Sequence, residues 1–291
     1  MTNIKRSPMM RKKITFGFTL LWVMALGLFV ISSGCKKKGV SLTPEDLGSD
    51  KEIYQKAKKR MKRDPEKARL LFKEIMHLYP DSIYARRAKI GIADSYFKQK
   101  DAASLIMAAA EYQEYVSLYP NSPDAVYAKF QVAMCYYKQK KKAGRDQTNT
   151  ILAVKALENM IKQYPGTKEA EESKKMIEAL RHILATHYYL IGVSNYRLKA
   201  YAGAINRFKQ VIDNYPDFKK NDRLFFYTGK CHMATRNYDT AISFFQKIIN
   251  SYPKSKYMKK AAKMIKKITK LKAAMPKDKK KPERKKLENK K

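Results

Sequence analysis

The sequence contains few residues of the kinds that break helices or carry out chemistry. Its 291 residues include 11 Gly, 11 Pro, 3 Cys and 4 His. The scarcity of glycine and proline, beside many good helix formers, predicts an all-α chain. Three cysteines are too few for a disulfide scaffold. The histidines lack metal-ligand spacing, and no phosphate-binding glycine loop or nucleophile motif occurs, so we expect no metal, no cofactor and no enzymatic activity.

Acidic residues are also scarce. Asp and Glu number 26 against 63 Lys and Arg, which gives a formal net charge of +37. Such an excess indicates an anionic partner, which can be a nucleic acid, a membrane surface or an acidic protein. The hydrophobic fraction of 44% is sufficient to form a buried core, so the composition argues against disorder of the whole chain.

The N-terminal region has the pattern of an export signal. Three basic residues at 11–13 precede the apolar run "ITFGFTLLWVMALGLFVI" at 14–31. At about 1.5 Å per residue, a helix over this run is slightly shorter than a bilayer core. A basic start, an apolar run and small residues after it are typical of a cleaved signal peptide.

The segment "SSGC" at 32–35 is similar to the lipobox at which bacterial lipoproteins are cut and lipidated. We therefore expect a signal peptide at 1–34, a lipid such as palmitate on Cys35 and a tether at 35–50. Ser32 stands where lipoboxes usually have Leu, and an uncleaved membrane anchor is the alternative. An exported, anchored protein does not meet chromosomal DNA, so no nucleic-acid partner is expected. The other two cysteines, Cys135 and Cys231, are expected to be buried small hydrophobes.

A repeated pattern fills most of the remaining sequence. The dipeptide Tyr-Pro recurs five times, with an alanine twelve residues before each proline and a large apolar residue four positions after each alanine. A small residue allows two helices to approach, the bulky one fills the space a turn later, and the proline ends the helix. This is the pattern of tetratricopeptide repeats. We predict an α-solenoid of five helix hairpins over 51–272, with repeats that end near Pro80, Pro120, Pro165, Pro216 and Pro253.

Two segments lengthen the repeats, and a basic region follows them. One is the polar insert at 140–150, and the other is 168–198, where a long helix is expected to link repeats 3 and 4. Residues 255–272 are expected to cap the solenoid as an amphipathic helix. The side chains predicted to face inward are Met258, Ala262, Ile265 and Leu271. Residues 273–291 are expected to be a disordered basic tail, which either solubilises the chain or docks on anionic lipid or acidic domains.

The repeats resemble one family of tetratricopeptide lipoproteins. The segments that carry the resemblance are "RDQT" (145–148), "AVKALENMIKQYPGTKEAEESKKMIEALR" (153–181) and "YLIGVSNYRLKAYAGAINRFKQVIDNYP" (189–216). They are similar to the BamD (ComL-type) family of outer-membrane β-barrel assembly lipoproteins. The resemblance implies a lipid-anchored protein on the periplasmic face of the cell outer membrane. Its implied partners are the periplasmic domains of BamA, other Bam lipoproteins and the β-signals of unfolded outer-membrane β-barrel proteins.

The resemblance also implies binding residues. Arg207, beside Asn206, matches a family arginine that pairs with an acidic group of BamA, although it can also be a solvated helix residue. A second partner-binding segment is expected at Arg145, Asp146 and Gln147. The alternative for this segment is a capped turn in which Asp146 or Thr148 starts the next helix.

A groove for the β-signal is expected to use aromatic side chains of the first two repeats. Most of these aromatic residues are expected to be core, and we favour Tyr79 and Tyr96 for the groove. The set considered is Tyr79, Tyr84, Tyr96, Phe97, Tyr112 and Tyr115. Two other readings stay open: a different periplasmic repeat lipoprotein, such as a pilotin or a cell-division coordinator, and a structural lipoprotein that binds peptidoglycan.

Overall fold

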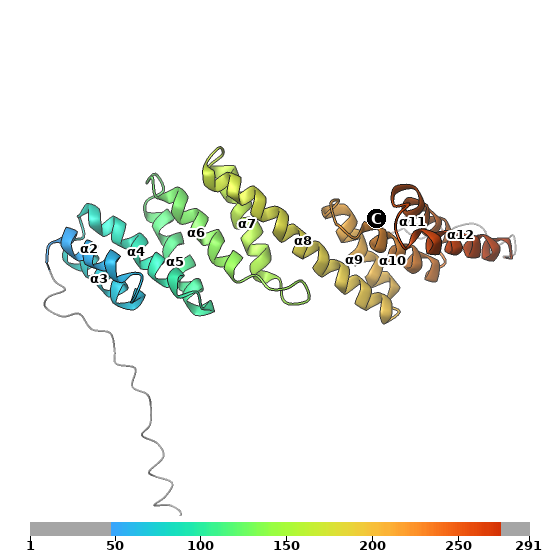
Figure 1. Cartoon of the computed structure of the whole chain (residues 1–291), viewed down its shortest axis with the longest axis horizontal. Coiled ribbons are helices and arrows are strands. Elements are labelled where there is room, and N and C mark those ends of the chain that lie inside the picture. Colours follow the sequence, from blue (N-terminus) through green and yellow to red (C-terminus); the bar gives the residue numbers. More distant parts are fainter. Residues whose placement is uncertain (1–47, 275–291) are drawn as a thin grey trace, which may run out of the picture. The chain divides into compact units, whose positions relative to one another are not determined.

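The computed structural model describes residues 48–274, and helices are the regular structure found there (Figure 1). The predicted signal peptide, Cys35, most of the predicted tether and residues 275–291 lie outside the described residues. The helices within 48–274 are α2 (Asp50–Arg60), α3 (Pro65–Leu78), α4 (Ile83–Gln99), α5 (Ala102–Leu118), α6 (Ala125–Lys138), α7 (Thr148–Gln163), α8 (Lys168–Arg197), α9 (Tyr201–Asn214), α10 (Asn221–Ala234), α11 (Tyr238–Ser251) and α12 (Met258–Ala273).

These helices form a solenoid of hairpins. The five hairpins are α2/α3, α4/α5, α6/α7, α8/α9 and α10/α11, and α12 packs against α11. Each second helix also contacts the first helix of the next hairpin, so successive hairpins pack against one another. The predicted all-α solenoid is confirmed.

The Tyr-Pro dipeptides end the second helix of every hairpin. Each tyrosine is the C-cap, with φ near −130° and ψ near 60°, because a residue before proline is disfavoured in the helical region. Its backbone N–H still donates to the carbonyl four residues earlier. The alanine and the bulky residue of each pattern are buried, and these are Ala68 and Phe72, Ala108 and Tyr112, Ala153 and Leu157, Ala204 and Phe208, and Ala241 and Phe245.

Glycine allows the closest helix contacts. A Cβ atom at Gly192 would lie 2.4 Å from a ring carbon of Phe208, and one at Gly229 would lie 2.8 Å from the ring of Phe245. Gly91 has the same relation to Phe72, with a Cβ distance of 2.6 Å. In that case the glycine lies on α4, the first helix of the next hairpin. Any side chain at these positions would push two helices apart.

Helix α8 has 30 residues and joins two hairpins, as the sequence predicts. Thr167 caps its first turn by accepting a hydrogen bond from the backbone N–H of Ala170 at 3.2 Å. In its first half, Leu180 packs into the core around Leu157 of α7. In its second half, Tyr189 packs against Phe208 of α9.

Helix α12 caps the last hairpin, but its inward face differs from the prediction. The buried residues are Ala261 and Ile268. Ile265 is partly buried against the same core, as predicted, whereas Leu271 is 39% exposed. Lys272 bonds to Asp239 of α11. Successive helix residues are rotated by about 100°, so Leu271 lies to the side of the face that carries Ala261 and Ile268. None of the helices in residues 48–274 combines the length and apolarity that a membrane crossing requires.

Candidate functional site

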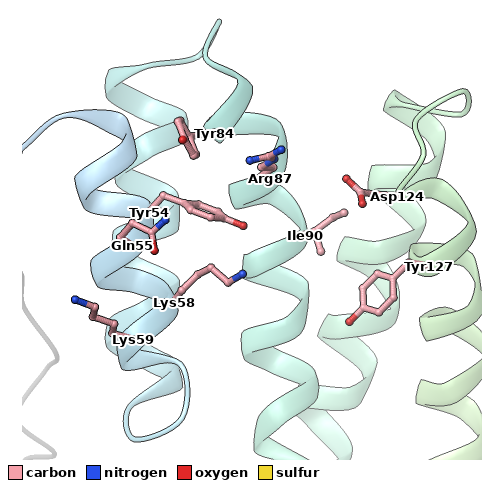
Figure 2. Close-up of a pocket in the computed structure, with 9 residues that line it drawn as sticks. All are labelled: Tyr54, Gln55, Lys58, Lys59, Tyr84, Arg87, Ile90, Asp124 and Tyr127. Carbon is pink, nitrogen blue, oxygen red and sulfur yellow. The ribbon is translucent and has the colours of Figure 1, made fainter.

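A pocket of 730 Å³ lies across the first helices of three successive hairpins. We call it the N-terminal pocket, and Figure 2 shows the residues that line it. From α2 come Tyr54, Gln55, Lys58 and Lys59; from α4 come Tyr84, Arg87 and Ile90; and from the start of α6 come Asp124 and Tyr127. Tyr54 and Lys58 point from α2 toward α4. Three cations face one carboxylate in this lining, so the pocket is positive.

A capping box and two hydrogen bonds to the turn between α3 and α4 hold the start of α2 at the edge of the pocket. Ser49 and Glu52 form a capping box at its N-terminus. The hydroxyl of Ser82 donates to the carboxylate of Asp50, and the hydroxyl of Tyr79 donates to the carbonyl of Gly48 at 3.0 Å. The turn between α3 and α4 therefore fixes the start of α2, and with it the position of the α2 side chains in the pocket.

Aromatic rings and cations are interleaved in the pocket. The rings of Tyr54 and Tyr84 are 5.2 Å apart between centroids. The Lys58 ammonium lies 5.7 Å from the Tyr54 centroid, and the Arg87 guanidinium lies 5.8 Å from the Tyr84 centroid. Burial raises the pKa of Tyr54, and the Arg87 charge opposes that rise. The ring faces thus help to hold two cations beside an apolar surface.

A carboxylate lies under one side of the pocket. Asp94 accepts hydrogen bonds from the hydroxyls of Tyr112 at 2.5 Å and Tyr127 at 2.8 Å. Burial raises the pKa of Asp94, whereas the two tyrosine bonds and the Lys58 charge act to lower it. Burial, with the nearby Asp94 charge, also raises the pKa of both tyrosines. Asp94 joins α4, α5 and α6, and it orients the Tyr127 ring at the pocket wall.

This arrangement suits binding better than bond-breaking chemistry. Tyrosine rings and Ile90 can bury apolar or aromatic side chains, while Lys58, Lys59 and Arg87 can meet a carboxylate. No group of His, Cys, Asp or Glu in residues 48–274 is arranged to hold a metal ion. A peptide with aromatic side chains and a free carboxylate matches these groups.

The two tyrosines favoured for a groove lie elsewhere. Tyr79 holds Gly48 and does not line the pocket. Tyr96 is partly buried in the core between α4 and α5, with the Arg69 guanidinium 3.9 Å from its centroid. Both side chains make contacts within the chain, although Tyr79 stays 36% exposed. Of the aromatic residues considered from the sequence, Tyr84 is the one that lines the pocket.

The sequence pattern did not single out Tyr54, Lys58, Arg87 or Tyr127. The sequence nevertheless contains one indication of the pocket. Tyr54 and Lys58 are four residues apart, so they lie on the same face of α2. That face differs from the one through buried Ala57. The repeat pattern identifies only the positions at which helices pack on one another. It gives no information about the opposite side of each first helix, where the pocket residues lie.

The insert between α6 and α7 is an ordered turn. Gln147 is 4% exposed, and its amide nitrogen donates to the carbonyls of Lys142 and Arg145, both at 2.9 Å. Its amide oxygen accepts from the Thr150 hydroxyl at 2.8 Å. Gln147 therefore has almost no surface for a partner, and the predicted partner-facing role does not hold for it. It closes the loop instead.

Asp146 bonds to the first residue of α7, while the N-cap position is Gln147, which makes no side-chain capping bond. The Asp146 carboxylate accepts from the backbone N–H of Thr148 at 3.2 Å and from the Thr148 hydroxyl at 2.8 Å. These bonds lower the pKa of Asp146. His187 of α8 holds the same loop through a 2.7 Å contact between Nδ1 and the Ala143 carbonyl. Arg145 remains exposed on this fixed loop, so a partner can reach it.

Arg207 and Asn206 are exposed on α9, next to buried Phe208. The Arg207 guanidinium donates to the Gln210 amide oxygen at 3.1 Å, one turn along the same helix. It forms no ion pair with a residue in 48–274. The guanidinium is thus oriented along the helix surface and accessible to an acidic group of another molecule.

The two remaining cysteines have the predicted environment. Cys135 and Cys231 are buried and unpaired, and burial raises the pKa of each thiol to about 12. They pack as small apolar residues in the cores around Tyr112 and Phe208, respectively.

A curated protein with a similar sequence is named as an outer membrane protein assembly factor. A curated relative is the outer membrane protein assembly factor BamD of Rickettsia prowazekii (strain Madrid E), which is 29% identical over 121 residues. The match covers 42% of this chain and 48% of that protein, so it spans about half of the relative's length.

Two solved structures of MamA are also similar. The MamA RS-1 ArsTM double mutant is 17% identical, with 70% of this chain and 95% of that chain covered and a TM-score of 0.31. A MamA crystal structure is 19% identical, with 72% and 94% covered and a TM-score of 0.28. TM-scores this low carry no argument about the fold.

The family matches are more extensive. A tetratricopeptide repeat is matched over residues 223–255. The YfiO family, described as outer membrane lipoproteins, is matched over residues 48–235, which is more than half of the chain. The chain therefore belongs to the YfiO family of outer membrane lipoproteins.

Proposed function

We propose that this protein is a lipid-anchored scaffold for the assembly of outer-membrane β-barrel proteins. It is anchored through Cys35 on the periplasmic face of the outer membrane, and it acts by binding and without catalysis. The N-terminal pocket receives the C-terminal β-signal of an unfolded barrel protein, and the surface around Arg207 binds a periplasmic domain of BamA. Other Bam lipoproteins complete the assembly. Family membership and the relative named as an assembly factor support this proposal.

The chemistry of the N-terminal pocket is the observation that carries the proposal. A β-signal is an extended peptide with alternating aromatic and apolar residues. Tyr54 and Tyr84 form an aromatic pair 5.2 Å apart between centroids that can bury one such side chain. Arg87, beside them, can hold the terminal carboxylate with two hydrogen bonds. The pocket thus provides one subsite for each kind of group.

The pocket is tested with a synthetic peptide that ends in an aromatic residue and a free carboxylate. We expect Arg87→Gln in the full chain to weaken its binding about tenfold, because a hydrogen bond to a charged group is lost. The measurement is fluorescence anisotropy of the labelled peptide in detergent. Arg86→Gln is the matched control, because Arg86 is the exposed neighbour outside the pocket.

Two outcomes would refute the pocket assignment. One is equal weakening by Arg86→Gln and Arg87→Gln, which would indicate a general charge effect. The other is an amidated peptide that binds as tightly as the acid and responds equally to Arg87→Gln. The expected result is that amidation weakens binding to the wild-type chain and removes most of the effect of the substitution.

The Arg207 surface is tested by co-purification of BamA after mild detergent extraction. We expect Arg207→Glu to abolish recovery of BamA, because a carboxylate replaces the guanidinium that binds an acidic group of BamA and would repel that group. Lys209→Glu is the control on the same helix, with an exposed side chain on another face. Helical circular dichroism establishes that both variants are folded. Unchanged recovery with Arg207→Glu removes the case for this contact. Recovery of a secretin or of cell-wall fragments in place of BamA would refute the assembly role.

A further inference from the structure

Helix α12 presents six lysines on one face. At about 100° per residue, they occupy roughly a third of the helix circumference. The buried residues Ala261 and Ile268 lie on the opposite face, against α11. We call the six exposed residues the lysine stripe, and they are Lys259, Lys260, Lys263, Lys266, Lys267 and Lys270.

No acidic residue offsets this charge within a long segment. From Thr240 to Lys277 the sequence contains eleven lysines and no Asp or Glu. In α12, Lys272 bonds to Asp239 of α11, outside the lysine stripe. Within residues 48–274, none of the six stripe residues forms an ion pair. No ion pair within residues 48–274 therefore neutralises the lysine stripe.

The lysine stripe is unfavourable for the helix that carries it. Lys259 and Lys263, and likewise Lys266 and Lys270, are like charges four residues apart, which destabilise a helix. Lys259 and Lys260 also lie in the first turn, where the helix dipole is positive. No side chain caps this N-terminus. An external anion that covered the stripe would relieve both effects.

Helix α8 shows the usual arrangement in the same chain. Its first turn carries Glu169 and Glu171, which match the helix dipole. Lys174 forms an ion pair with Glu171 at 2.6 Å. Charges on α8 are therefore balanced within the helix, whereas those on α12 are not. The difference indicates that α12 is adapted to an external anionic surface.

We propose that the lysine stripe of α12 docks on an anionic lipid bilayer surface. Four to eight basic residues on an amphipathic helix are the pattern that binds anionic headgroups. The stripe contains lysine alone, whose compact ammonium needs no particular carboxylate geometry, whereas arginine is preferred for pairing with protein carboxylates. It runs about 17 Å along the helix, so several headgroups contact it at once.

Two further observations favour a membrane over an acidic protein. Leu271 is 39% exposed beside the stripe and can enter the boundary between headgroups and acyl chains. The family to which the chain belongs consists of outer membrane lipoproteins, so a bilayer surface lies within its setting. The docking does not involve the N-terminal pocket or Arg207, and it can hold or fail independently of the assembly role.

The test compares the full chain on phosphatidylcholine vesicles with the chain on vesicles that also contain phosphatidylglycerol. Acylation of individual lysines is followed by mass spectrometry. We expect the six stripe lysines to react roughly fivefold more slowly on the anionic vesicles, which corresponds to about 1 kcal/mol per residue near such a surface. Lys155 and Lys162, exposed on α7, should react equally on both. High salt should remove the difference.

A variant separates α12 from the basic residues that follow it. The stripe variant carries Lys→Gln at 259, 263, 266 and 270, and the matched control carries Lys→Gln at the exposed positions 98, 155, 162 and 209. We expect anionic vesicles to slow amide hydrogen exchange of 258–273 in the control and not in the stripe variant. Equal lysine reactivity on both vesicle types overturns the proposal. So does protection by soluble polyglutamate where anionic vesicles give none, because that result identifies a protein partner.

Discussion

The N-terminal pocket and the lysine stripe are both positively charged, but they are built from different groups. In the pocket, Lys58 and Arg87 lie beside tyrosine rings, and Asp94 lies below. In the stripe, the lysines extend into solvent with no carboxylate in the helix. The pocket spans three hairpins, whereas the stripe belongs to one helix.

This difference distinguishes specific ligand recognition by the pocket from non-specific electrostatic binding by the stripe. Tyrosine rings lie beside Lys58 and Arg87 in the pocket, so a ligand must match the positions of these cations, and shape contributes to binding. The stripe cations form no ion pair within residues 48–274, although Lys260 lies 5.6 Å from the centroid of the Tyr257 ring. A dense anionic surface can therefore satisfy them without a particular geometry, and binding depends strongly on salt. A net charge of +37 therefore does not describe one function. The neighbours of each cation decide what it binds.

The largest effect is expected from a substitution that destabilises the helices of the pocket and leaves the helix of the stripe unchanged. Phe72 fills the space at Gly91 of α4 and contacts the Tyr54 ring at 5.7 Å between centroids. Phe72→Ala should destabilise α2–α4 by about 3 to 5 kcal/mol, the usual loss for a buried phenylalanine. Amide exchange should become faster throughout α2–α4, and the pocket should lose its peptide. Exchange in α12 should not change, because each hairpin contacts only its neighbours.

Phe245→Ala is the reciprocal control for this experiment. Phe245 packs against Gly229 of α10 and lies in the core that holds α12. Its loss should accelerate exchange in α10–α12 and leave α2–α4 protected. If each variant accelerates exchange along the whole chain, the solenoid unfolds as one unit, and the two regions are not independent.

The packing targeted by these variants could be predicted from the sequence, because the repeat pattern is local. Alanine, a bulky residue and proline recur at fixed distances. The first two mark a contact between helices adjacent in sequence, and the proline marks the end of a helix. The Gly192–Phe208 and Gly229–Phe245 contacts follow that spacing. Gly91 does not, because it meets Phe72 of the preceding hairpin, and the spacing across a hairpin junction varies with the length of the turn.

The pocket could not be predicted in the same way. It requires α2, α4 and α6 to present side chains to one space, and the relative rotation of these helices is set by core packing far from the pocket. Tyr79 was a reasonable candidate as a conspicuous aromatic residue, but its hydroxyl is bonded to Gly48. Gln147 shows the converse case. A polar residue in a loop indicates a surface role, yet three hydrogen bonds within the chain hold it in the interior.

A smaller effect is expected from the carboxylate below the pocket. Tyr127→Phe removes one of the two tyrosine hydrogen bonds to Asp94. Since the lost bond involves a charged acceptor, it should cost about 1.5 to 3 kcal/mol of stability at neutral pH. Tyr84→Phe is the control, because it changes another pocket tyrosine with no hydrogen bond to Asp94. Urea unfolding followed by circular dichroism gives both values.

The pH dependence of Tyr127→Phe has a definite sign. The folded-state pKa of Asp94 is raised, so the folded chain binds a proton more tightly than the unfolded chain does. Its contribution to stability therefore increases as the pH falls from neutral through that pKa, and it levels off below the ordinary pKa of Asp. Because the Tyr127 bond acts to lower this pKa, its removal should steepen the increase. A cost of Tyr127→Phe that grows on acidification would contradict the assigned role of Asp94.

The smallest expected effect concerns the stripe itself, and it tests whether its lysines repel one another. Lys266→Glu places a carboxylate four residues before Lys270 and three after Lys263, so it replaces two repulsive pairs with attractive ones. Helix α12 should become more stable by about 0.5 to 1 kcal/mol at low salt, measured by amide exchange. Lys174→Glu on α8 should have the opposite sign, because it breaks the ion pair with Glu171. If Lys266→Glu destabilises α12, or if its effect persists at high salt, the lysines are not under mutual repulsion. The contrast between pocket cations that lie beside tyrosine rings and stripe lysines that repel one another would then lose its physical basis.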